Sequence, residues 1–361
     1  MRGVFRRAGA VVAAAVVAAA CGGSGSSSCT PQQGGATASP TLDAWCQVSM
    51  VNGDIVPNAG VTPYNLNTPL FSDYAVKRRT VWMPAGASAT YDATGVFQFP
   101  EGTVLTKSFG MADDVRKANP VVTWVETRVM WLSGGQWNAI SYTWDAAQKT
   151  ATAAPGGGVY QKSFIGPDGT TLTANYLVPQ VQQCRQCHED SAIMTPIGPK
   201  ARNLNRDLTY PDGTTENQLA RWTRLGLLTG APDPASAPRL AVWNDPTTGT
   251  LEERARAYLE GNCAHCHSPG GEARTTALFL SSLVTEPIQY GICKKPVAAG
   301  GGAGGNLYDI VPGQPDASII PYRLASTEPS VAMPQIGRSV VDEAGLQLVR
   351  DWITSLTGSC P

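Results

Sequence analysis

The chain has 361 residues, of which 42% are hydrophobic and 15% are charged, and its formal net charge is −1. A chain of this length and apolar content can bury more than one core, so we expect about two or three domains and exclude a disordered chain. Its few, balanced charges offer no large basic surface, and nucleic acid is not expected as a partner.

The first residues have the pattern of an export signal. Arg2, Arg6 and Arg7 precede a run of small apolar residues at 8–20, which is too short to span a bilayer and ends at Cys21. Residues 18–21, Ala-Ala-Ala-Cys, resemble a bacterial lipobox. We therefore expect 1–21 to be a signal peptide with Cys21 lipidated, or else an ordinary cleaved signal, and the protein to be a periplasmic lipoprotein anchored in the outer membrane.

Residues 22–53 are expected to be a flexible tether, because Gly, Ser, Thr, Ala and Pro fill most positions between 22 and 40. Residues 54–180 then predict a β-rich domain, since β-branched and aromatic runs alternate with Gly, Pro and Asp. Its clearest unit is a hairpin from Val121 to Trp144 around the loop Ser133–Gln136. Several short strands without helical periodicity favour an all-β sandwich or small barrel.

After Pro179 the hydrophobic period changes from two to 3.6 residues. Thr250 and Glu253 form a capping-box pattern that predicts the start of a helix. A second helix is expected to begin near Asp342, with Val349 and Trp352 on its apolar face. The second half of the chain is therefore predicted to be mainly α-helical.

Two CxxCH motifs, at 184–188 and 263–267, carry the chemistry. In this motif two cysteine thiols bind the vinyl groups of a haem and the histidine ligates its iron. The predicted haem-attachment residues are Cys184, Cys187, Cys263 and Cys266, with His188 and His267 as iron ligands. One alternative is a zinc site built from the two CxxC pairs, which would leave both trailing histidines unexplained. The other is a pair of redox disulfides, but such a dithiol is expected at the start of a helix in a βαβ pattern.

The sixth iron ligand is predicted separately for each haem. Met333 is the only methionine downstream of the second motif, so we expect it to ligate the second haem, with a role as core filler as the alternative. For the first haem, Met194 is the only methionine between the motifs. Its other candidates are Met83, Met111, Met130, His265 and an open site.

Nine cysteines are present, and the lipid and haem assignments leave Cys29, Cys46, Cys293 and Cys360. In an exported protein these four residues suggest two disulfides, with three possible connectivities. Proximity in the sequence favours Cys29 with Cys46 and Cys293 with Cys360. Free thiols are the alternative.

Lys200 and Arg202 follow the first motif and suit the propionates of a haem, while a solvated surface position is an equal alternative. Together these observations predict a multidomain α+β protein. Residues 181–248 are expected to bind the first haem. Residues 249–361 are expected to form a class I cytochrome c-like domain with the second haem.

Several segments resemble the family of exported dihaem c-type cytochrome lipoproteins that have an N-terminal β-rich region and a C-terminal class I cytochrome c-like domain. The matching segments are Thr62–Tyr74, Gly102–Lys107, Val125–Arg128, Pro196–Asn205, Asn217–Leu219, Asn262–His267 and Gly291–Lys294. This resemblance implies two haems, a periplasmic or outer-membrane location and electron transfer. It also implies a parallel β-helix repeat protein as a candidate partner.

The leading functional hypothesis is an electron carrier between redox partner proteins. The alternative is a peroxidase-like or oxidase-like enzyme in which the first haem keeps an open site and the second relays electrons. A third hypothesis takes the β-rich domain as a ligand-binding or surface-interaction module. No sugar, phosphate or metal signature in residues 54–178 supports the third hypothesis.

Overall fold

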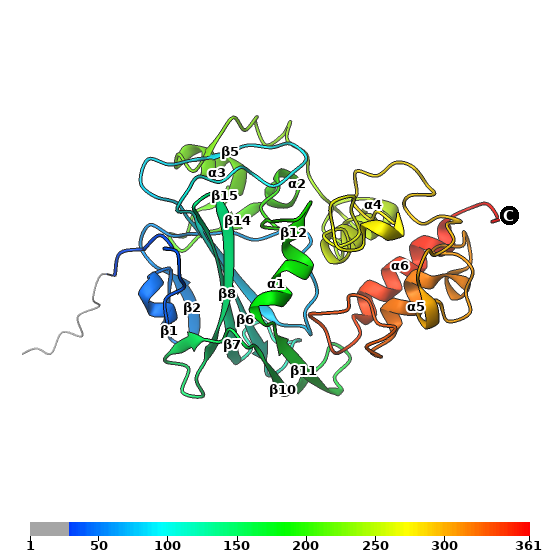
Figure 1. Ribbon diagram of the computed structural model, residues 1–361, viewed down its shortest axis with the longest axis horizontal. Coiled ribbons are helices and arrows are strands. Elements are labelled where there is room, and N and C mark those ends of the chain that lie inside the picture. The colour runs from blue at the N-terminus through cyan, green and yellow to red at the C-terminus, as the bar shows by residue number, and fades with distance from the viewer. Residues whose placement is uncertain (1–28) are drawn as a thin grey trace, which may run out of the picture.

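The structure is a computed structural model that describes residues 29–361 (Figure 1). The predicted signal peptide and the lipidation site Cys21 lie outside the described residues. No helix within the described range is long and apolar enough to cross a membrane.

An antiparallel six-stranded sheet forms the centre of the first half, in the order β3-β4-β6-β7-β8-β9. Its strands are β3 (Thr62–Pro63), β4 (Val76–Trp82), β6 (Val104–Ala112), β7 (Val122–Ser133), β8 (Gln136–Trp144) and β9 (Ala151–Ala153). The predicted hairpin is confirmed as β7 and β8, with Ser133 paired to Gln136. Gly134 and Gly135 make its turn at φ of 61° and 71°, a conformation that glycine adopts without steric cost.

Smaller two-stranded sheets flank the central sheet. They are β1 (Val48–Val51) with β2 (Asp54–Pro57), β10 (Gly158–Ile165) with β11 (Thr171–Val178), β12 (Glu189–Asp190) with β13 (Ile193–Met194), β14 (Asp207–Thr209) with β15 (Thr215–Asn217), and β5 (Ala89–Thr90) with β16 (Leu228–Thr229). The fold is α+β in general, as predicted. The prediction that the chain after Pro179 is mainly α-helical is wrong, because the five short strands β12 to β16 and long loops lie there with the helices. The predicted small barrel is not formed, because β3 and β9 are the two edges of one open sheet.

The folded part of the chain begins earlier than predicted. A 3-10 turn, η1 (Leu42–Trp45), buries Leu42 and Trp45 against the central sheet, and the Trp45 indole N–H donates to the Tyr142 hydroxyl at 2.6 Å. The tether prediction for 22–53 is therefore wrong from residue 42 onward. Two large apolar side chains outweigh the cost of ordering a segment that composition alone marks as flexible.

The helices are α1 (Val181–His188), α2 (Ala201–Leu204), α3 (Gln218–Arg224), α4 (Leu251–Asn262), α5 (Ile319–Ala325) and α6 (Glu343–Ser355). Three short 3-10 turns accompany them, η2 (Arg274–Thr276), η3 (Gly300–Ala303) and η4 (Pro315–Ala317). Helices α4, α5 and α6 gather at the opposite end of the molecule from β1 and β2 (Figure 1). The capping box of α4 is confirmed, since the Thr250 hydroxyl accepts from Glu253 N–H and the Glu253 carboxylate accepts from Thr250 N–H.

Helix α6 packs closely on α4. Its N-cap is Asp342, where the sequence predicts the start of the helix, and the Asp342 carboxylate accepts a hydrogen bond from the Gly345 N–H. A Cβ atom at Gly345 would lie 2.2 Å from the Tyr258 ring, so only glycine lets the two helices approach this far. Tyr290 and Trp352 close this core edge to face, with ring centroids 6.0 Å apart.

Both expected disulfides are present. Cys29 pairs with Cys46, and Cys293 pairs with Cys360, with Cα–Cα distances of 5.7 and 5.1 Å. The first joins the start of the described chain to η1, and the second ties the C-terminus to the loop before η3. Both pairings match the connectivity that the sequence favours.

A segment that we call the strap, Tyr64–Tyr74, runs between the sheet and the helical end. The Asn65 backbone and the Gln218 side chain exchange two hydrogen bonds, and Phe71 N–H donates to the Asn262 side chain at 2.7 Å. The Asp73 carboxylate accepts the N–H groups of Ser339 and Val340. The strap thus connects α3, α4 and the loop before α6 to the sheet.

Replacing Gly345 with alanine is expected to destabilise the protein by about 1–3 kcal/mol, because the new methyl group would overlap the Tyr258 ring. Thermal unfolding measures this loss. Gly301→Ala is the matched control, since nothing lies within 4 Å of a Cβ there. An equal stability in both variants would contradict the close packing of α6 on α4.

Candidate functional site

The first CxxCH motif forms the second half of α1, which packs against β8. The helix begins with a reciprocal bond between Gln180 and Gln183. It ends at His188, because the chain turns back soon afterwards through Ser191 and Ala192 at φ of 53° and 68°. Cys184, Cys187 and His188 therefore lie on one short, well-defined element.

The His188 ring has the orientation of a metal-ligating imidazole. Its Nδ1 lies 3.0 Å from the Thr195 carbonyl oxygen. A carbonyl only accepts, so Nδ1 carries the proton and Nε2 keeps its lone pair for a metal. Burial lowers the pKa of His188 to about 4, which keeps the imidazole neutral at pH 7.

The second motif continues directly from the end of α4. Cys263 leaves the helical conformation at φ −129°, and the next residues fold into a turn in which His267 N–H donates to the Cys263 carbonyl at 2.9 Å. Asn262 is held from both sides, by Phe71 of the strap and by the Tyr258 carbonyl. Burial also lowers the pKa of His267 to about 4.

The two motifs touch each other. The Cys266 thiol donates to the Gln186 carbonyl at 3.3 Å, and Ser191 N–H donates to the Gly270 carbonyl at 2.8 Å. The metal-binding atoms of Cys187, His265 and Cys266 all lie within 4.8 Å of one another. The Cys266 thiol lowers the pKa of Cys187, and Cys187 in turn raises the pKa of Cys266.

Each motif lines its own cavity. The first cavity is lined by Cys184, Cys187 and His188 and by side chains of the central sheet. Its empty volume is about 1500 Å³, including the part that is open to solvent. The second, of about 1440 Å³ on the same measure, is lined by Cys263, Cys266 and His267 and also by Met333. Cys187, His265 and Ile336 line both cavities. The cavities are therefore neighbours.

The loop that carries Met333 is fixed through its backbone. Arg338 donates to the carbonyls of Met333 and Ser326, both at 2.8 Å, and Arg323 donates to the Val331 carbonyl at 2.8 Å. The Asp73 carboxylate of the strap holds the next residues of the same loop. The structure places Met333 at the second cavity with His267, where the sequence predicts an iron ligand.

Of the candidates for the first haem, only two line the first cavity. They are Met130, on β7, and His265, in the second motif. Met194 lies in β13 and packs against the hydrophobic cluster that buries Met83 and Met130, and Met111 is buried in another cluster, but of these four methionines only Met130 lines the first cavity. As the sixth iron ligand of the first haem, the structure therefore favours Met130 or His265 over Met194.

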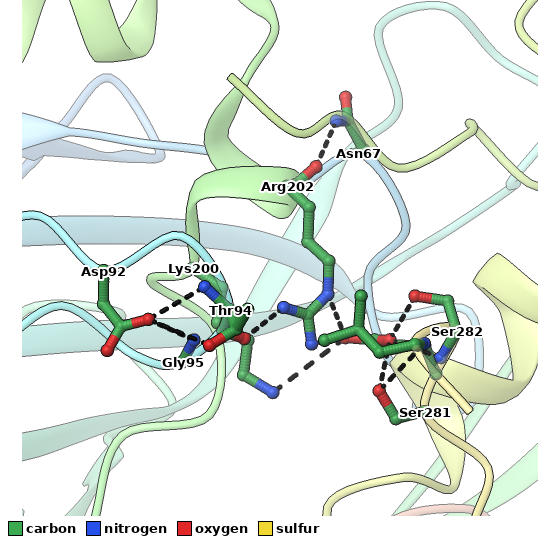
Figure 2. Close-up of polar contacts among 10 residues, drawn as sticks. Asn67, Asp92, Thr94, Gly95, Lys200, Arg202, Ser281 and Ser282 are labelled. Carbon is green, nitrogen blue, oxygen red and sulfur yellow. Dashed lines mark hydrogen bonds and ion pairs between the residues drawn. The ribbon is translucent and has the colours of Figure 1, made fainter. Parts of the chain in front are cut away.

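Arg202 has a different role from the one predicted. It is buried rather than solvated, and it pairs with the buried carboxylate of Glu260. Figure 2 shows Arg202 beside Thr94 and Lys200. It also donates to the Thr94 carbonyl. Lys200 lines the first cavity, with its Nζ 4.0 Å from Glu260.

Glu260 is the centre of a polar cluster that joins α2 to α4. Figure 2 shows its partners Lys200, Arg202, Ser281 and Ser282. Its second oxygen accepts from the hydroxyls of Ser281 and Ser282 and from Ser282 N–H. Burial raises the pKa of Glu260, but the attraction of Arg202 and Lys200 outweighs it, and the net direction is downward. The carboxylate is therefore charged at neutral pH.

The sequence analysis missed a row of basic residues on the cavity wall formed by the sheet, Arg79, Lys107 and Arg128. Arg79 ends the consecutive basic run 77–79, and Lys107 lies between Thr106 and Ser108, and such polar surroundings are usual for a solvated face. A signal was available in the sequence, since a basic residue occurs on each of three successive long strands.

Comparison with protein-family models, curated proteins and solved structures found no match for this chain. The donor set nonetheless fits covalent haem, because the four motif cysteines are free and His188 directs an unprotonated nitrogen away from its hydrogen bond. The cluster of Cys187, His265 and Cys266 is the competing zinc site. Its atoms come from both motifs, so zinc there would occupy groups that two haems need.

Replacing Arg202 with methionine is expected to cost about 3–5 kcal/mol of stability, because Glu260 would remain buried without its partner. Urea unfolding measures the loss. Arg224→Met is the matched control, since its pair with Glu216 is exposed and contributes about 0–1 kcal/mol. Equal losses in both variants would show that the buried pair is not a structural link.

The stability of the protein is expected to fall on acidification in a way that depends on Glu260. Its folded-state pKa is lower than the ordinary 4.5, so its contribution is complete above about pH 4.5 and is lost as the pH falls through the folded pKa. Unfolding curves of wild type and Glu260→Gln should therefore converge at low pH. A constant gap between them would contradict this assignment.

Proposed function

We propose that the chain is an exported dihaem c-type cytochrome that transfers electrons between redox partner proteins. The observation that carries this proposal is that each CxxCH motif lines a separate cavity and the two cavities share Cys187 and His265. Two haems attached there would be neighbours. A short separation between redox centres is what electron transfer through one protein needs.

The chain's own residues have defined tasks in this proposal. Cys184 with Cys187, and Cys263 with Cys266, would hold one haem each through thioether bonds, and His188 and His267 would ligate the irons. Bound haem supplies reversible one-electron chemistry. Met333, whose loop is held by hydrogen bonds from Arg338 and Arg323, would ligate the iron of the second haem together with His267 and would favour the reduced state of that iron.

The cellular setting of the proposal comes from the sequence. The targeting pattern at 1–21 supports an exported protein held at the outer membrane through lipid on Cys21. The family resemblance supports a C-terminal cytochrome c-like region, and so does the packing of α6 against α4, the helix that leads into the second motif. It also suggests a parallel β-helix repeat protein as a partner.

A second candidate, a peroxidase-like or oxidase-like enzyme, is favoured by one feature of the first cavity. Its wall carries ionisable groups as well as apolar ones: Arg128 bonds to the buried carboxylate of Glu126, which also accepts from the Tyr176 hydroxyl at 2.6 Å. Such groups are what an open haem site needs for acid–base steps. A high-spin first haem in the absorption spectrum would favour this enzyme over the carrier.

Intact mass spectrometry tests the cofactor assignment. The protein made with a haem-maturation system is expected to carry two covalent haems. Cys184→Ala with Cys187→Ala, and Cys263→Ala with Cys266→Ala, should each lose one. The Cys293→Ala variant is the control, since that cysteine forms a disulfide and should keep both haems. A zinc-containing protein without haem would end the proposal.

Replacing Met333 with alanine is expected to remove the near-infrared band of a thioether bound to ferric haem and to lower the potential of one haem, because a neutral soft ligand is lost. Optical spectroscopy and potentiometry measure both effects. Met194→Ala is the control and should leave the band intact. Loss of the band in Met194→Ala but not in Met333→Ala would reverse the assignment.

A further inference from the structure

Three basic residues form a straight row across the sheet on the wall of the first cavity. Arg79 of β4 pairs with Lys107 of β6, which pairs with Arg128 of β7. Directly paired residues point to the same face of a sheet, and neighbouring strands are about 4.8 Å apart. The three side chains therefore lie next to one another, and all three line the cavity.

The row is only partly neutralised by the residues that the structure describes, since Arg128 alone of the three has an ion pair there. Arg79 is only 5% exposed, its Nη1 donates to the Asn65 side chain, and its Nη2 is buried with no hydrogen-bond partner in the described part of the chain. The Lys107 ammonium lies 4.7 Å from the centre of the Phe109 ring. Burial and then the neighbouring cations Arg79, Lys77 and Arg128 lower the pKa of Lys107 well below its ordinary value.

Within residues 29–361, Glu126 is the one carboxylate that forms an ion pair with a member of this row. A single oxygen of Glu126 accepts both from Arg128 and from the Tyr176 hydroxyl. The two guanidinium groups of Arg79 and Arg128 already exceed this one carboxylate, and Lys107 adds to the excess whenever it is protonated. Buried positive charge of this kind is costly unless an anion joins it. The shortage of negative charge is largest around Arg79 and Lys107, because Glu126 pairs with Arg128.

The cavity wall next to the basic row is apolar, which indicates the rest of the ligand's structure. Two residues away from Lys107 on β6 and from Arg128 on β7 lie Leu105 and Met130, which pair with each other, and Met130 also pairs with Ala139 of β8, so the three form an apolar row next to the basic one. They also line the cavity. A ligand lying on both rows has an apolar body and carboxylate groups at one edge, since a guanidinium matches the planar geometry of a carboxylate.

We propose that Arg79, Lys107 and Arg128 form a binding site for carboxylate groups in the first cavity, beside the first CxxCH motif. The carboxylates come from one of two sources. They are the propionates of a haem held by Cys184 and Cys187, in which case the site rests on the proposed function, or they belong to a free dicarboxylate that enters the cavity.

The test uses the full chain and succinate as the probe, with binding measured by calorimetry. The variants are Arg79→Gln and Lys107→Gln. Arg78→Gln is the matched control, because Arg78 is the neighbour of Arg79 on β4 but is half exposed and paired with Asp54. Resonance Raman spectra of the haem-loaded protein report on the propionates independently of succinate.

If the propionates fill the site, the haem-loaded protein does not bind succinate, and the propionate bands shift in Arg79→Gln and Lys107→Gln but not in Arg78→Gln. The chain with Cys184→Ala and Cys187→Ala then gains succinate binding. If a free dicarboxylate fills the site, the haem-loaded wild type binds succinate and each of the two variants weakens it on the order of tenfold or more.

The proposal is overturned if the haem-loaded protein does not bind succinate and the propionate bands are also unchanged in Arg79→Gln and Lys107→Gln. It is equally overturned if succinate binds with the same affinity to wild type and both variants. If mass spectrometry finds no haem, the proposed function fails, and succinate binding to that haem-free chain, lost in Arg79→Gln, still supports the site.

Discussion

A buried ion pair between Arg202 and Glu260 joins the two segments of the chain that carry the CxxCH motifs. Arg202 belongs to α2, which follows the first motif, and Glu260 belongs to α4, which leads into the second. Charges this deeply buried are costly unless each is fully paired, so the pair permits little variation in how α2 and α4 meet. The strap reinforces this arrangement, because Asn67 donates to the Arg202 carbonyl and Phe71 donates to Asn262 (Figure 2 shows the first bond).

The contact between the two motifs follows from this constraint. With α4 held against α2, the second motif begins where the strap passes, and Cys266 reaches the backbone of Gln186. A Cβ atom at Gly261 would lie 2.9 Å from the Thr68 carbonyl oxygen, so α4 lies directly against the strap. The two cavities are neighbours for the same reason, and the proposed transfer of electrons depends on that proximity.

The sequence predicts what local chemistry decides. The turn at Gly134 and Gly135, the capping box at Thr250 and the start of α6 at Asp342 each depend on residues close together in the chain, and the structure has all three. Both disulfides were also predicted, from cysteine arithmetic and proximity.

Long-range pairing was beyond the sequence. Nothing near Arg202 indicates that Glu260 will reach it, and the row of Arg79, Lys107 and Arg128 exists only once three strands are in register.

The most direct test of the central claim is the low-temperature electron paramagnetic resonance spectrum of the fully oxidised protein. Adjacent haems predict lines broadened by spin–spin coupling, which sharpen when Cys263→Ala and Cys266→Ala remove the second haem; a wild-type spectrum equal to the sum of two isolated haems would contradict the account.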